Sequence, residues 1–431
     1  MLKNFAYHAA LSGGLCSVLS AQAANGIYLT AYGAEATAMG GAEIAAVSDT
    51  GALIANPAGL ANIANSRTDY SATAFSIART GHKDGYSGRT RVSNELGSVV
   101  GAGHARRFNS ERQFVWGAGV NVAGGLGYVY NNLDNLYGTV DDATSLFSLF
   151  RFSGGLAWNY SDKLRLGVVV AATYAGAEQS LFEDTSVATA EQTFFGVKVR
   201  DLSGWGGDVK LGMQYQVNEQ VVVGANYTTE SKIDLDGGSM TVNYEAIGAG
   251  RVTYQDVSME GLETPREFGI GVFWKPRADW GLAAEANWFD WAGSTRRLTL
   301  SASRPDRAAP ADELEFSSST KMHSQIVYSI GVEKHLGNNR TLRAGYSYHS
   351  LILDKASLSP TFALTPRHDL SVGYTNKLNR RWLINTALAY QPRTETRYHN
   401  PETPFGPSSE INESLALHFT FSQINQGSRP L

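Results

Sequence analysis

The sequence predicts an all-β protein, a transmembrane barrel of about fourteen antiparallel strands with an N-terminal plug, or hatch, of short helices in its lumen. Three observations lead to this prediction. The chain has 45 glycines and 11% aromatic residues but only 12 prolines, which is typical of β-rich proteins. Segments that alternate apolar and polar residues recur along it. The connections between these segments alternate between short turns and long loops, as in outer-membrane barrels.

Residues 1–23 have the pattern of a secretory signal peptide. Lys3 supplies the positive start, a short apolar stretch follows, and Ala21-Gln22-Ala23 matches a cleavage site. Cys16, the only cysteine of the chain, lies inside this signal. The mature protein is therefore expected to be exported and to have neither a disulfide nor a cysteine metal site.

Residues 24–66 do not alternate as strands do. The stretch "YGAEATAMGGAEIAAVSDTGALIANPAGLANI" is rich in alanine and glycine, with Ser48-Asp49 as a helix cap and Pro57 as a helix stop. A segment this apolar needs a buried place, and about fourteen strands enclose more space than their inward side chains fill. We therefore expect residues 24–66 to form a hatch inside the barrel.

Residues 67–422 are expected to form the barrel, and residues 423–431 a C-terminal tail. In "LRLGVVVAATY", Leu166, Val168 and Val170 share one face, so we expect Leu166 to face lipid and Arg165 to face the lumen. Short turns are expected near residues 109, 161, 218, 277, 338 and 380. The tail lacks the terminal aromatic residue that is usual in outer-membrane barrels.

The segment "NWFDWAG", residues 287–293, places two tryptophans on opposite faces of one strand end. Trp288 continues the apolar face of Trp280 and Leu282, so we expect it to meet lipid near the outer interface. Trp291 has the other parity and is expected to face the loops or the lumen.

The apolar residues change their spacing in "DDATSLFSLFRF", which begins at Asp141. Leu146, Phe147, Leu149 and Phe150 cluster at helical spacing behind acidic residues that suit a helix start. One interpretation is an extracellular helix that offers an apolar groove to a hydrophobic solute. The alternative is a strand that simply begins early.

Two further sets of residues are candidate functional sites. The inward basic residues could meet a substrate carboxylate, or could pair with acids of the hatch and the wall; they are Arg151, Lys163, Arg165, Lys210 and Arg343. Gly117, Gly119, Gly124 and Gly125 lie in and after the predicted third strand. Inward glycines allow a close backbone approach or a bulge, although general glycine richness would also explain them.

The hatch stretch, "FVWGAGVNVAGGLGYVY", "TPREFGIGVFWKP" with "WFDWAG", and "LRAGYSYHS" with "PRHDLSVGYTNKLN" together resemble the FadL/TodX family of outer-membrane transporters. The resemblance covers nearly the whole mature chain. It implies that Asn56, Pro57 and Ala58, which alone would read as an ordinary turn, brace the hatch against a kinked third strand. It also implies that the glycines of this strand open a lateral gap in the wall.

The same resemblance implies passive transport of hydrophobic small molecules, most often long-chain fatty acids. The solute would be captured in an extracellular groove, pass the hatch and leave sideways near the third strand. Uptake of aromatic hydrocarbons, a hydrophilic porin, and an outer-membrane adhesin or structural barrel are the alternatives. The expected location is the outer membrane of a Gram-negative bacterium. The expected partners are outer-membrane lipid, lipopolysaccharide and the barrel assembly machinery, with the protein itself a monomer.

Other classes of function have little support in the sequence. A formal charge of −4 gives no reason to expect nucleic acid as a partner. The G-x-G pairs lie inside strands with no helix after them, so they do not form a phosphate loop. No hydrolase or metalloprotease motif is present. We therefore expect no enzyme activity, no cofactor and no metal site.

Overall fold

The computed structural model describes residues 23–108 and 113–425. Nearly all of the expected signal peptide, and residues 426–431 of the expected tail, lie outside these ranges. Within the described ranges no helix has the length and the apolar character that a membrane crossing requires.

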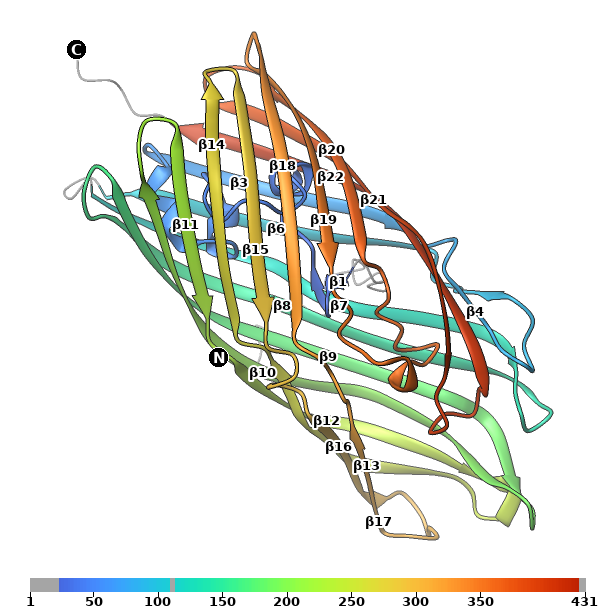
Figure 1. Ribbon diagram of the computed structural model, residues 1–431. Coiled ribbons are helices and arrows are strands. Elements are labelled where there is room, and N and C mark those ends of the chain that lie inside the picture. The colour runs from blue at the N-terminus through green and yellow to red at the C-terminus, as the bar shows by residue number, and fades with distance from the viewer. Residues whose placement is uncertain (1–22, 109–112, 426–431) are drawn as a thin grey trace.

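The described strands form one closed antiparallel barrel of fourteen strands, which confirms the predicted fold class (Figure 1). β3 (Ser66–Ser76) and β22 (Pro407–Asn425) close it through pairs that run from Ser66–Asn425 to Ser76–Leu415. The other uninterrupted strands are β6 (Leu96–Arg107), β7 (Phe114–Asp134), β8 (Val140–Asn159), β9 (Leu164–Ala188), β10 (Thr193–Gln216), β19 (Arg340–His349), β20 (His368–Lys377) and β21 (Trp382–His399).

Four barrel strands are interrupted and consist of two elements each. They are β11 (Val221–Thr228) with β12 (Ser231–Tyr244), β13 (Gly250–Thr264) with β14 (Glu267–Arg277), β15 (Trp280–Phe289) with β16 (Arg297–Pro305), and β17 (Glu313–Ser319) with β18 (Gln325–Gly337). At the end with the long loops, β12, β13, β16 and β17 continue the wall as a projecting sheet, seen at the bottom of Figure 1. Short turns join the strands at the opposite end, near the expected positions.

Side chains alternate between the outer surface and the lumen. On β9, Val168 and Val170 are exposed while Val169 is fully buried, so Leu166 shares the outer face and Arg165 the inner one. The two tryptophans also lie as expected. Trp288 is 38% exposed on the outer face, whereas Trp291 is 1% exposed.

The helix considered for the segment after Asp141 does not form. These residues belong to β8, which pairs with β7 on one side and β9 on the other. Two ladders satisfy the backbone of the segment, and this decides for a strand over the helical spacing. Alternation then places Phe147 and Leu149 on the opposite face from Leu146 and Phe150. The four residues therefore cannot line one groove.

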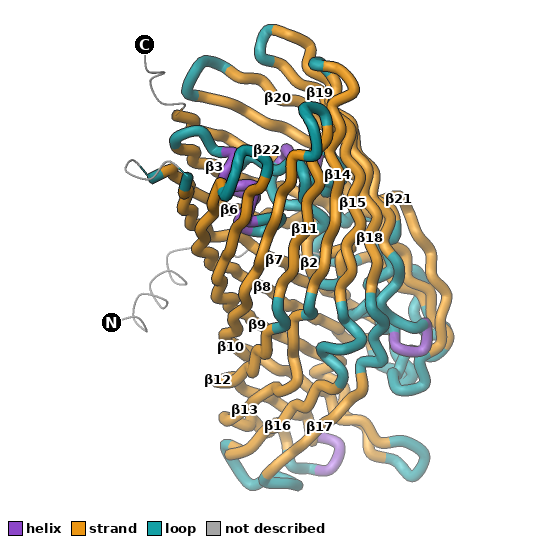
Figure 2. The backbone as a smooth tube through the Cα atoms, turned by 60° about the vertical axis from the view of Figure 1, so that its left-hand side comes forward, coloured by secondary structure: helices purple, strands orange, loops and turns teal. Residues whose placement is uncertain are grey.

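The N-terminal segment packs against inward residues of the wall. Figure 2 shows its helices in purple, close to β3 and β6. It contains β1 (Ala23–Asn25), β2 (Tyr28–Leu29), α2 (Ala34–Ala38), η1 (Thr50–Leu53) and η2 (Pro57–Asn62). Asp49 caps η1 by accepting a hydrogen bond from the Gly51 amide. Pro57 does not stop a helix but occupies the first turn of η2, where its missing N–H costs nothing.

The remaining elements lie in the long loops. They are β4 (Gly81–Lys83), β5 (Thr90–Arg91), η3 (Glu245–Ile247) and η4 (Lys355–Ser357). β4 continues the wall beyond the long-loop end of β3 by pairing with β22.

Candidate functional site

The Asn56-Pro57-Ala58 sequence attaches the N-terminal segment to β9 and β10. The Asn56 side-chain amide donates to the carbonyl of Met213 in β10 at 3.0 Å. A Cβ at Gly212 would overlap Asn56, and one at Gly167 of β9 would overlap the Pro57–Ala58 backbone. The implied contact of these three residues with the third strand is therefore replaced by contacts with β9 and β10. Leu53 and Leu60 instead pack toward the third strand, β7.

Charged groups also hold the segment. Arg343 of β19 donates to the Glu35 carboxylate at 2.9 Å and to Glu333 at 3.1 Å. The Glu285 carboxylate accepts from the backbone amides of Glu43 and Ile44 at 2.8 and 2.7 Å. These contacts tie the N-terminal segment to β15 and β19.

Two carboxyl groups of the segment bind protons more tightly than exposed ones. Burial raises the pKa of Asp49 to about 7, although the nearby Arg67 guanidinium acts to lower it. Burial likewise raises the pKa of Glu43, with Asp49 and Glu285 adding to the effect.

The arginines considered as carboxylate contacts do not come together. Arg151 forms a two-pronged ion pair with Asp208, with Nη2 2.6 Å from Oδ1. Arg343 is bound to acids of the segment and wall, as described above. Arg165 lies far from both along the strands. It pairs with Asn159 of β8 and Gln214 of β10 and is partly buried. Arg151 and Arg343 are thus paired with acids of the wall and of the N-terminal segment.

β6 and β7 part over a short stretch of the wall. Their regular pairing ends at Gly101–Asn121, and β7 has a bulge between Val122 and Gly124. Beyond the gap, the chain before β6 rejoins β7 where the Ser93 amide donates to the Val129 carbonyl at 2.7 Å. Among the described pairs, none joins residues 96–100 of β6 to residues 122–126 of β7. We call this stretch the wall window.

The glycines of β7 have separate roles around the wall window. Gly117 and Gly119 lie in regular pairing with Ala105 and Gly103, so the strands do not part there. Added Cβ atoms at these two positions would press on Leu60 and Leu53 of the N-terminal segment. Gly124 and Gly125 lie inside the window. The departure of the strands thus begins after Asn121, beyond the first two glycines.

The N-terminal segment fills the wall window from the lumen. β2 pairs with β7 at Tyr28–Gly124, and the Gly125 amide donates to the Ile27 carbonyl at 2.9 Å. The Tyr32 hydroxyl donates to the Ala123 carbonyl at 2.5 Å. A Cβ at Gly124 would overlap the Ile27 carbonyl, so only glycine permits this approach. β2 therefore satisfies backbone groups that β6 leaves without a ladder partner.

Trp291 holds β1 and β2 from the other side of the lumen. Its ring lies 5.6 Å from that of Tyr28, centroid to centroid. Gly26 makes the turn between β1 and β2 with φ 67°, and a Cβ there would lie 2.5 Å from the indole. The indole Nε1 is buried with no hydrogen-bond partner among the described residues. Packing, and not hydrogen bonding, fixes this contact.

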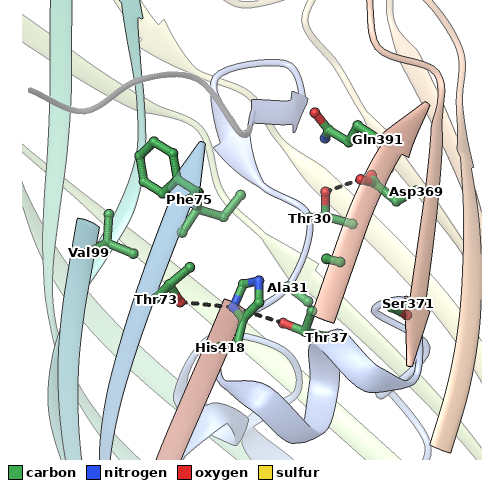
Figure 3. A pocket seen from close by; sticks show the side chains of 13 residues that line it. Thr30, Ala31, Thr37, Thr73, Phe75, Val99, Asp369, Ser371, Gln391 and His418 are labelled. Atoms are coloured by element: carbon green, nitrogen blue, oxygen red, sulfur yellow. Dashed lines mark hydrogen bonds between the residues drawn. The ribbon is translucent and has the colours of Figure 1, made fainter. Parts of the chain in front are cut away.

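A cavity lies between the N-terminal segment and the wall (Figure 3). The space in and in front of it is about 510 Å³ when the solvent at its open side is counted, but the room for water-sized molecules inside is only about 30 Å³. It is lined by Leu29, Thr30, Ala31, Thr37, Gly40, Thr73, Phe75, Val99, Asp369, Ser371, Ala389, Gln391 and His418. Leu29 belongs to β2 and Val99 to the β6 edge of the wall window. The cavity therefore reaches the window and is separated from it by β2.

Sequence reasoning missed the polar residues of this cavity. Asp369, Ser371 and His418 have the inward parity of their strands, and this parity is the only signal that could have suggested them. Nothing in the sequence shows that they meet Thr30 and Thr37, more than three hundred residues away.

Comparison with known proteins agrees with this architecture. The family model described as "Outer membrane protein transport protein (OMPP1/FadL/TodX)" matches residues 15–419. Outer membrane protein P1 of Haemophilus influenzae is 24% identical over 338 residues, which cover 72% of this chain and 69% of that protein.

Solved structures of similar fold include two toluene transporters. TodX of Pseudomonas putida has a TM-score of 0.75 and 19% identity, covering 92% of this chain and 99% of its own. TbuX of Ralstonia pickettii has a TM-score of 0.74 and 18% identity, covering 92% and 98%. A FadL homologue of Pseudomonas aeruginosa has a TM-score of 0.73 and 13% identity, covering 93% and 100%. At these identities the likeness shows the fold.

Proposed function

The chain belongs to the OMPP1/FadL/TodX family of outer-membrane transport proteins for hydrophobic compounds, and on this premise we propose that its solute crosses the lumen cavity and leaves sideways through the wall window. The protein is located in the outer membrane. The observation that carries the proposal is the place of β2, which stands between the cavity and the window and pairs with β7 inside it.

Lateral release suits an apolar solute. Such a molecule gains nothing from an aqueous pore through the periplasmic end, but partitions readily into lipid. The hydrogen-bonding groups of the β7 backbone in the window cannot be satisfied by lipid, so another polar group has to replace β6 there. β2 serves this purpose when the window is closed, and a displacement of β2 opens the path.

The N-terminal segment acts as the hatch in this proposal. Its contacts with β7, β9, β10, β15 and β19 fill the lumen and block passage of hydrophilic solutes. No energy source or cofactor is needed, because the solute moves down its own gradient. A nonspecific hydrophilic porin, one of the alternatives, would need the lumen that this segment occupies.

The route from outside follows one apolar cluster. This cluster of buried side chains reaches from Tyr130 and Phe405 at the long-loop end to Phe75 and Ala389, which also line the cavity. We place capture of the solute at the long-loop end of this cluster. It replaces the groove expected from Leu146, Phe147, Leu149 and Phe150.

Outer-membrane lipid and lipopolysaccharide are the proposed surroundings of the apolar outer face, and the barrel assembly machinery is the proposed route of insertion. The exposed outward residues of β22 support contact with lipid. They are Leu415, Leu417, Phe419 and Phe421. Closure of the barrel within one chain supports a monomer.

Uptake measurements test the function. Cells with and without the gene are given labelled toluene or a labelled long-chain fatty acid, and the purified protein is assayed in liposomes with the same compounds. Faster uptake of either compound supports transport. Equal uptake with and without the protein, in both assays, would leave the adhesin or structural alternative standing.

A further inference from the structure

The lumen cavity has an apolar half and a polar half. Leu29, Ala31, Phe75, Val99 and Ala389 form the apolar half. The polar half comes from β20, β21 and β22 with Thr30 and Thr37 of the N-terminal segment (Figure 3). A site with this division suits a solute that is apolar over most of its length and has one polar group at its end.

Two polar atoms of the polar half are buried without a partner. Ser371 is 6% exposed and His418 is 7% exposed, and neither the Ser371 hydroxyl nor His418 Nε2 has a hydrogen-bond partner among the described residues. The other ring nitrogen, Nδ1, lies 2.8 Å from the Thr73 hydroxyl and 3.4 Å from that of Thr37, which itself donates to the Gly33 carbonyl. These contacts orient the ring and leave Nε2 to the cavity. Buried polar atoms of this kind cost free energy unless a ligand or water satisfies them.

The charge of the lining is negative. Asp369 is its one charged residue, and the lining contains no lysine or arginine. The Asp369 carboxylate accepts from the Thr30 hydroxyl at 3.0 Å and lies 2.9 Å from His349 Nε2. Arg151 and Arg343, which could have received a carboxylate, are paired with Asp208, Glu35 and Glu333. A carboxylate in the cavity would lose its water and lie near a like charge, with no lysine or arginine of the lining to compensate it.

We propose that this cavity selects uncharged hydrophobic solutes that carry a hydroxyl group, such as phenols or long-chain alcohols, over solutes that carry a carboxylate. The inference rests on the proposed transport function and names its class of substrate. A ligand hydroxyl can both donate and accept, so it can satisfy the Ser371 hydroxyl or His418 Nε2. Its uncharged state avoids the repulsion from Asp369. A plain hydrocarbon fits the apolar half but leaves both polar atoms without partners.

Three ligands with the same ring and methyl group test the proposal. They are p-cresol, toluene and 4-methylbenzoate, and their binding to the purified protein in lipid nanodiscs is measured by equilibrium dialysis at neutral pH. We expect p-cresol to bind about tenfold more tightly than toluene, and 4-methylbenzoate to bind most weakly. Ser371→Ala is expected to remove most of the advantage of p-cresol over toluene. Ser153→Ala is the matched control, because Ser153 is also buried with a hydroxyl lacking a described partner but lies outside the cavity.

Asp369→Asn tests the charge separately from the hydroxyl contacts. This change keeps the shape of the side chain and is expected to strengthen the binding of 4-methylbenzoate while p-cresol changes little. Binding of 4-methylbenzoate to the unchanged protein as tightly as p-cresol would overturn the proposal. So would an unchanged ranking of the three ligands in both variants, or binding of none of them. Heat-modifiable gel mobility verifies that each variant is a folded barrel.

Transport of the same ligands into liposomes separates this inference from the proposed function. Uptake of toluene, p-cresol and 4-methylbenzoate at equal rates above empty liposomes would reject the selectivity of the cavity and keep the transport function. Uptake of none of them, nor of a long-chain fatty acid, above empty liposomes would reject the function itself.

Discussion

The indole of Trp291, in the interruption between β15 and β16, lies 5.6 Å from the ring of Tyr28 in β2, centroid to centroid. Tyr28 in turn is paired with Gly124 in the wall window. One buried tryptophan thus supports the short strand that closes the proposed exit.

Replacing Trp291 by alanine is expected to release β1 and β2 while the barrel stays closed. Loss of a buried indole costs about 3–5 kcal/mol, and here the loss falls on a short segment and not on the wall ladders. Hydrogen exchange of residues 25–32 should become faster, and passage of hydrophobic solutes through liposomes should increase. Trp288→Ala, on the outer face of the same segment, is the control. Equal exchange in the two variants would contradict the supporting role of Trp291.

Replacing Gly124 by valine should displace β2 from the wall window, since the new side chain has no space beside the Ile27 carbonyl. We expect altered transport with little loss of barrel stability. Gly154→Val is the control, because a Cβ at Gly154 meets no atom within 4 Å. Valines at Gly117 and Gly119 should instead loosen the packing of Leu60 and Leu53. If Gly124→Val transports as the unchanged protein does, the solute leaves by another route.

The two faces of β9 can be tested with a pair of neighbouring residues. Leu166→Arg puts a charge on the lipid face and should destabilise the barrel by about 2–4 kcal/mol if the position is near the midplane. Arg165→Leu changes a lumen residue and should leave folding nearly intact. Urea unfolding in lipid vesicles measures both. Similar losses in the two variants would show that the faces are wrongly assigned.

A buried histidine should make the long-loop end of the barrel sensitive to pH. His82 of β4 lies 2.5 Å from Glu410 and 3.0 Å from Asp84. The hydroxyls of Tyr398 and Tyr130 donate to the Glu410 carboxylate. Burial by itself would lower the pKa of His82, but the hydrogen bonds to Asp84 and Glu410 outweigh it and raise the pKa to about 9. The raised value means that the folded state holds this proton more tightly than the unfolded state.

The stabilisation by His82 should therefore be complete below about pH 6.5, decline as the pH rises, and be lost above about pH 9. Hydrogen exchange of residues 77–95, corrected for the intrinsic effect of pH, measures it. In His82→Gln this dependence should be absent and exchange should be fast at every pH. A dependence that persists in the variant would assign the effect to the carboxyl or tyrosine groups around it.

Much of the wall could be predicted because alternation is a local property. Leu164 and Leu166 alternate with Arg165, and the outer places of Val168 and Val170 follow from the same period of two. The segment after Asp141 was ambiguous because its apolar residues suit both the helical and the strand period. Only its pairing with β7 and β9 decides for a strand. Two hydrogen bonds depend on how the closed wall brings distant residues together. They join Asn56 to Met213 and Thr30 to Asp369. No local pattern contains that information.

The wall window is bounded by the Gly101–Asn121 ladder pair at one end and by the Ser93–Val129 backbone hydrogen bond at the other, and this limits both its size and the cost of opening it. Among the described pairs, β6 has none with β7 over residues 96–100, which is about 16 Å of extended chain. No strand of the barrel has to separate from its neighbour for a molecule to pass. For the proposed exit, β2, its turn and the Tyr32 side chain have to move. Permeability and mechanical robustness are therefore set by different parts of this chain, and a wall of any stability can be combined with a fast exit.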